Sequence, residues 1–275
     1  MASQANRRVL PGFRTGISFT LMYLAVLIIV PLMAVLLRAS SMSPADFLRV
    51  VWTPQARAAY ALTFGASIVA AVIDVFLGLL LAWILVRYEF PGKRIVDSLI
   101  DLPFALPTAV AGLVYSTLYA KNGWMGQFLV PLGIHAAYSR LAVVLVLVFV
   151  GLPFVVRALE PVLEALDPEL EEAAACLGAS RWTTVRRVVL PHLYPALMTG
   201  FTLTLARGIG EYGSVVFVSG NKPFETEIAP YLIVTKLEAF KYNEATAIAT
   251  VLLGASFTLL GVINYLERRS ASHAT

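Results

Sequence analysis

The sequence contains few charged residues and few of the side chains that build metal or disulfide sites. Only 14% of its 275 residues are Asp, Glu, Lys or Arg, whereas about 25% are charged in an ordinary soluble domain. A single cysteine, Cys176, excludes an intramolecular disulfide and any site built from several cysteines. The three histidines lie far apart without metal-ligand spacing, so we expect no bound metal and no cofactor.

The chain also lacks the phosphate-binding pattern G-x-x-x-x-G-K-[ST]. It therefore cannot bind ATP through such a loop, and we do not expect it to be an enzyme. Its net charge of +4 is small. In an apolar chain this excess is typical of basic loops on one side of a membrane, and we expect no nucleic-acid partner.

Apolar residues are abundant: they make up 59% of the chain, and the mean hydropathy is +0.78. A soluble core cannot bury that surplus, so lipid must cover much of the surface. A membrane span needs about 20 apolar residues, and six stretches qualify. The predicted fold is an all-α polytopic helical bundle. Its six transmembrane helices are expected near residues 17–37, 62–86, 100–119, 141–159, 193–219 and 245–266.

Basic residues in the connecting segments predict the orientation of these spans. With the N-terminus in the cytosol, twelve Lys and Arg residues fall in cytosolic segments and eight in outer loops. The positive-inside rule favours this arrangement. We therefore expect a multi-pass membrane protein with both termini in the cytosol.

The segment of about 165–191 is too polar to span a membrane and is patterned like a pair of short helices. Asp167 is the expected N-cap of the first helix, and Pro168 suits its first position. Gly178 is the expected helix stop, and Ser180 can cap a second helix that ends before Pro191. From the pattern alone, two alternatives remain: a hairpin that docks on another protein, or an amphipathic hairpin on lipid headgroups.

The same segment resembles a motif of known transporters. Glu172, Ala173 and Ala174 are followed after three residues by Gly178, and after nine more by Val188-Val189-Leu190-Pro191. This is similar to the E-A-A-x3-G-x9-I-x-L-P loop of binding-protein-dependent ABC importer permeases, with valine in place of isoleucine. The resemblance implies the ABC transmembrane type-1 fold and a location in the bacterial cytoplasmic membrane. It also implies that Glu172, Ala173, Ala174, Gly178, Leu190 and Pro191 dock the chain on a cytosolic ATPase subunit.

Five further stretches narrow the resemblance. They are similar to the T-type permease family of sulfate and thiosulfate importers. The stretches are RRVLPGF (7–13), RYEFPGKR (87–94), DLPFALPTAVAGL (101–113), PFVVR (153–157) and LARGIGEYG (205–213). The resemblance implies four kinds of partner: a homologous W-type permease, two copies of a cytosolic ATP-binding subunit, a periplasmic or surface sulfate-binding protein, and membrane lipid. Molybdate permeases share two of these stretches, so another oxyanion such as molybdate remains an alternative substrate.

Three charged residues fall in predicted spans away from the span ends: Asp74, Arg207 and Glu211. A charge at the centre of a bilayer costs about 2.5–3.5 kcal/mol on insertion scales. Arg207 and Glu211 are four residues apart, so one helix face can hold them as an ion pair. The pair either neutralises itself against the bundle or lines the translocation path, where Arg207 offsets the charge of a passing anion. For Asp74 we expect a structural role, with a partner or water. Pro103 and Pro107 should kink the third span.

These observations predict three segments: residues 1–57 as a cytosolic N-terminus, first span and outer loop, 58–266 as a type-1 permease domain, and 267–275 as a cytosolic tail. The function predicted is ATP-driven import of sulfate or thiosulfate, with ATP hydrolysis in a partner subunit. Two other classes remain as alternatives. An ion-gradient-driven transporter would need a site for its coupling ion, and an intramembrane enzyme would need a cluster of catalytic residues. The sparse histidines and acids argue against both.

Overall fold

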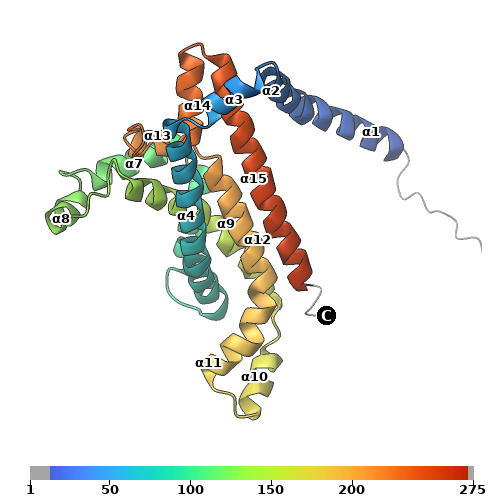
Figure 1. The fold of residues 1–275 in the computed structure, drawn as a ribbon. Coiled ribbons are helices and arrows are strands. Elements are labelled where there is room, and N and C mark those ends of the chain that lie inside the picture. The colour runs from blue at the N-terminus through green and yellow to red at the C-terminus, as the bar shows by residue number, and fades with distance from the viewer. Residues whose placement is uncertain (1–12, 272–275) are drawn as a thin grey trace, which may run out of the picture.

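The computed structural model describes residues 13–271, so the stretch 7–12 of the first quoted motif and the tail 272–275 lie outside the described part. Within it the regular elements are all helices, as predicted. Figure 1 shows a central bundle of long helices with shorter elements at both ends. Five helical stretches are long and apolar enough to cross a membrane: Thr15–Ser40, Pro54–Arg87, Arg140–Ala165, Arg181–Ile209 and Tyr242–Tyr265.

The centre of the bundle is made by α4 (Pro54–Arg87), α9 (Arg140–Ala165) and α12 (Leu190–Ile209), which pack against one another. Two glycines allow close approach around Val155 of α9. A Cβ added to Gly78 of α4 would lie 2.6 Å from Val155 Cγ1, and one added to Gly200 of α12 would lie 2.9 Å from Val155 Cα. Small residues of this kind let helices in a membrane approach backbone to backbone.

The first membrane helix lies apart from this bundle (Figure 1). It comprises α1 (Phe13–Leu24), the π-helix η1 (Ala25–Ile29) and α2 (Val30–Ser40), and its most apolar 18-residue stretch buries no residue. Only its final turns are held, because Arg38 Nε donates to Asn243 Oδ1 (3.2 Å) and its guanidinium lies over the ring of Tyr242. The short helix α3 (Pro44–Val51) then leads into α4.

The third predicted span is wrong as a continuous helix. The predicted range 100–119 holds the last residue of α5 (Lys93–Ile100), then α6 (Leu102–Ala105) and α7 (Thr108–Tyr119). A proline forces the preceding residue towards extended backbone, and Leu106 before Pro107 has ψ 135°. Pro107 therefore breaks the span instead of kinking it, and the 12 residues of α7 cover only about 18 Å.

The fifth predicted span is also wrong in extent. Its helix ends at Ile209, where Gly210 is the C-cap, and the chain then turns into α13 (Val215–Val218). The remaining elements are α8 (Gly126–Leu129) and the 3-10 helix η2 (Val130–Leu132) between α7 and α9, α14 (Ala229–Glu238), and α15 (Tyr242–Ala271). The first, second, fourth and sixth predicted spans correspond to continuous helices.

Candidate functional site

The segment that follows α9 forms the predicted pair of short helices at one end of the molecule (Figure 1). The first is α10 (Pro168–Cys176), and Asp167 caps it by accepting the backbone N–H of Glu169 (2.9 Å). The second is α11 (Arg181–Thr184), and Ser180 caps it by accepting the N–H of Thr183 (3.2 Å). Both predicted caps are confirmed.

The turn between α10 and α11 depends on Gly178. Its φ of +80° lies in the left-handed region, which glycine adopts without the cost that a Cβ imposes. The N–H of Gly178 bonds to the carbonyl of Ala175 (2.9 Å), and that of Ala179 to the carbonyl of Ala174 (3.0 Å). These two bonds form a Schellman motif, which ends a helix at a glycine. The predicted helix stop is confirmed.

The second helix does not end before Pro191, contrary to the prediction. It continues from α11 through the π-helix η3 (Val185–Val189) into α12, so Pro191 lies in the first turn of α12. At the end of this π-helix, Leu190 donates its N–H to the carbonyl of Val185, five residues earlier. Pro191 follows at once and has no N–H that would need a partner there. Helices α11, η3 and α12 therefore form one continuous helix, and we call its exposed end, together with α10, the tip.

The E-A-A residues lie on a tip that exposes large apolar side chains. Glu172 and Ala173 are exposed, and Ala174 is half-buried. Leu177 is 89% exposed and Trp182 is 70% exposed. Apolar exposure on this scale, next to charged residues, is typical of a surface that docks on another protein.

A salt bridge ties α10 to the end of α4. Arg87 Nη2 lies 2.6 Å from Glu171 Oε1, and the Arg87 guanidinium also lies over the ring of Trp83. Because only two residues separate α9 from α10 and α12 continues directly from α11, this end of the molecule is attached to all three central helices. A displacement of α10 would therefore reach the bundle through α4, α9 and α12.

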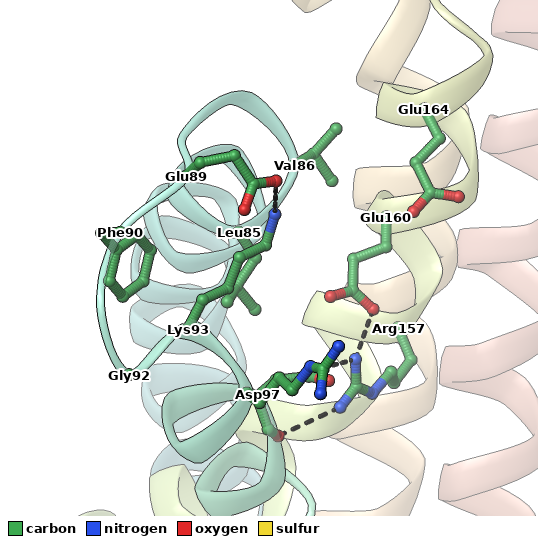
Figure 2. Close-up of a pocket in the computed structure, with 11 residues that line it drawn as sticks. Leu85, Val86, Glu89, Phe90, Gly92, Lys93, Asp97, Arg157, Glu160 and Glu164 are labelled. Atoms are coloured by element: carbon green, nitrogen blue, oxygen red, sulfur yellow. Dashed lines mark hydrogen bonds and ion pairs between the residues drawn. The ribbon is translucent and has the colours of Figure 1, made fainter.

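A cavity of about 660 Å³ lies beside this end, between the α4–α5 connection and the end of α9 (Figure 2). In Figure 2, Glu160 and Glu164 of α9 face Glu89 and Lys93 across it. Arg157 closes one side of the cavity.

The guanidinium of Arg157 binds carboxylates from two segments. It reaches Asp101 (2.6 Å), Asp97 (2.7 Å) and Glu160 (2.6 Å). Sequence reasoning assigned no role to this group, although Arg157 and Asp101 both fall in quoted motifs. Charged residues 56 positions apart reveal a contact only once the helices are placed.

The predicted pair of Arg207 and Glu211 is formed at the other end of α12. Arg207 Nη1 and Glu211 Oε2 make the ion pair. The second carboxylate oxygen, Glu211 Oε1, accepts the backbone N–H (2.9 Å) and the hydroxyl (2.8 Å) of Ser214. Glu211 is 2% exposed, whereas the side chain of Arg207 is 34% exposed. The pair thus lies at the C-terminal end of α12, with Arg207 in the last helical turn and Glu211 beyond it, and part of the Arg207 side chain is exposed.

The turn that carries Glu211 packs closely on the broken third span. A Cβ added to Gly112 of α7 would overlap the backbone carbonyl of Ser214, and one added to Gly213 would overlap the hydroxyl of Thr108. Glycine at both positions lets the backbones approach. The turn that carries Glu211, the partner of Arg207, is therefore held against α7.

Residues 74–271 of this chain match the family of binding-protein-dependent transport system inner membrane components. The probable sulfate transport system permease protein of Nephroselmis olivacea is 50% identical and covers 91% of this chain and 88% of its own. The sulfate transport system permease protein of Salmonella typhimurium is 46% identical, and the match covers 98% of this chain and 97% of that protein. A bacterial alginate ABC transporter, solved with an alginate-bound periplasmic protein, has a similar fold (TM-score 0.76, 18% identity, 93% of each chain).

Proposed function

The chain belongs to the family of binding-protein-dependent transport system inner membrane components, and from that premise we propose that it imports sulfate or thiosulfate. It is a membrane-spanning permease subunit, and ATP hydrolysis belongs to a partner subunit. The observation that carries the proposal is the identity of 46–50% to sulfate transport system permeases along nine-tenths of the chain.

The proposed complex contains this chain, a homologous W-type permease, two copies of a cytosolic ATP-binding subunit and a sulfate-binding protein on the outer side. The periplasmic protein in the related alginate transporter complex supports the last of these. Both termini are cytosolic in this proposal, residues 58–266 are the permease domain, and residues 1–57 and 267–275 flank it.

The exposed tip of α10 and α11 is the proposed docking surface for the ATP-binding subunit. Closure of two such subunits around ATP would move the tips of both permeases together. The rigid connection of this tip to α12 and its salt bridge to α4 then carry the movement into the bundle. At the far end of α12, the part-exposed guanidinium of Arg207 offsets the charge of the passing anion.

Reconstitution tests the function directly. The complete complex in proteoliposomes should take up radiolabelled sulfate only with ATP on the side of the ATP-binding subunit and with the binding protein on the other side. Excess thiosulfate should compete, and excess molybdate should not. Uptake driven by an ion gradient without ATP would contradict the proposal, and preferential uptake of molybdate would replace its substrate.

Two exposed leucines, one on the tip and one far from it, provide a test of the docking surface and its control. Leu177 is 89% exposed on the tip, and Leu132 is 74% exposed in the loop at the opposite end of α9. Burial of a leucine contributes about 1.5–3 kcal/mol, so Leu177→Ser should weaken binding of the ATP-binding subunit about 10- to 100-fold. Leu132→Ser should leave that affinity unchanged. Equal losses in both variants would remove the tip as the docking surface.

A further inference from the structure

Asp74 is a carboxyl group at the centre of the bundle that the proposed transport mechanism does not use. It lies in α4 and is fully buried (0% exposed). Neither of its oxygens has a hydrogen-bond partner in the part of the chain that the structure describes. The expected direct partner for this residue is therefore not found within residues 13–271.

The carboxyl group is fitted between the two helices that pack on α4. At Gly151 of α9 an added Cβ would overlap Asp74 Oδ2, so glycine provides the space that this oxygen occupies. The same added atom would overlap the methyl group of Thr204 of α12, and the Thr204 hydroxyl donates to the carbonyl of Gly151 (3.1 Å). Asp74, Gly151 and Thr204 thus interlock α4, α9 and α12 at one level.

No ionisable side chain on the surrounding helices is placed to balance a charge on Asp74. On α9 the nearest along the helix is Arg157, six residues from Gly151, and it is bound to three carboxylates. On α12 it is Arg207, three residues from Thr204, and it is paired with Glu211. The stretch of α15 that packs near this level, residues 245–264, contains no ionisable residue.

A bare carboxylate in such a site is very costly, because its charge is removed from water without a compensating cation or hydrogen bond. The neutral acid avoids that cost. We propose that Asp74 is a neutral carboxylic acid that locks α4 against α9 and α12, and that its proton must stay in place for anions to pass. The second part rests on the proposed function. An ionised carboxylate one helical turn from Arg207 would oppose the field that admits a dianion.

The protonation state can be measured apart from transport. Infrared spectra of the assembled complex should contain a carboxylic-acid C=O band that Asp74→Asn removes and Ser67→Ala leaves unchanged. Ser67 is the matched control, because it is also buried on α4 and its hydroxyl bonds only within the helix. Absence of a band specific to Asp74 at neutral pH would overturn the proposal even if sulfate import is confirmed.

Stability and transport supply the second readout. A group that is neutral when folded and ionised when unfolded releases a proton on unfolding, so stability falls as pH rises. The unfolding constant of the wild-type complex should increase up to tenfold per pH unit relative to Asp74→Asn. Uptake by the wild type should decline at alkaline pH, whereas Asp74→Asn, which stays neutral, should keep its uptake. An assembled Asp74→Asn complex that is less stable at every pH and transports at least tenfold more slowly would instead show that the charge is required.

Discussion

Replacement of Gly178 by valine tests the role of the turn between α10 and α11, because it changes the backbone preference there without a steric clash. No atom lies within 4 Å of a Cβ added at this position, so valine meets no steric clash with its surroundings. It does meet the cost of a left-handed backbone at φ +80°, about 1–2 kcal/mol for a residue with a Cβ. A cost of that size lowers the ratio of the formed to the unformed turn by a factor of about 5–30.

We expect ATP-dependent uptake per assembled complex to fall by a similar factor, because the tip then points away from its docking position for most of the time. The measurement pairs the initial rate of uptake with the rate of ATP hydrolysis by purified complex. Gly178→Asn should recover much of the loss, since asparagine tolerates the left-handed conformation better than other residues.

Gly133 provides a control with the same backbone cost. Its φ is +78° and no atom lies within 4 Å of its added Cβ, but it lies in the loop at the opposite end of α9. Gly133→Val should therefore leave the coupling between hydrolysis and uptake intact. Unchanged coupling in Gly178→Val, or an equal loss in Gly133→Val, would refute the reasoning that the turn directs the docking helix.

Three further outcomes are expected. If Arg207 assists the passing anion, Arg207→Met combined with Glu211→Gln should transport as poorly as Arg207→Met alone while its abundance recovers; full recovery of uptake would leave only a structural ion pair. In a background without the native cysteine, a cysteine at Ser43 should react with an impermeant thiol reagent added to intact cells and one at Ser180 should not; the reverse result would invert the proposed orientation. Gly112→Ala should reduce uptake at least tenfold, because the added methyl group displaces α7 from the turn at the end of α12, and normal uptake would show that this contact is not needed.

Features that depend on neighbours in the chain were predictable from the sequence. The apolar stretches predicted an all-α membrane bundle, because lipid requires helices whose backbone groups are satisfied internally. Asp167, Ser180 and Gly178 predicted the two caps and the turn. A cap or a left-handed glycine acts within a few residues, so its effect does not wait for tertiary contacts.

The breaks in two predicted spans were harder to predict from the sequence. Apolar residues lie on both sides of Leu106, so hydropathy does not reveal that Pro107 ends one short helix and precedes another. At the end of α12, Glu211 bonds to Ser214 and the turn packs on Gly112. That turn replaces the helix that an apolar pattern predicts, because hydrogen bonds within the turn satisfy part of its backbone and the turn packs on α7.

The sequence by itself thus determined that lipid surrounds much of this protein, which family it belongs to, and the local form of the segment that holds α10 and α11. Only the tertiary structure decided which charges meet: Arg87 with Glu171, Arg157 with three carboxylates, and Asp74 with none that the described residues supply. The physical reason is range. Hydropathy and capping act between neighbours along the chain, whereas the partner of a charge, or its lack of one, depends on how helices tens of residues apart pack in space.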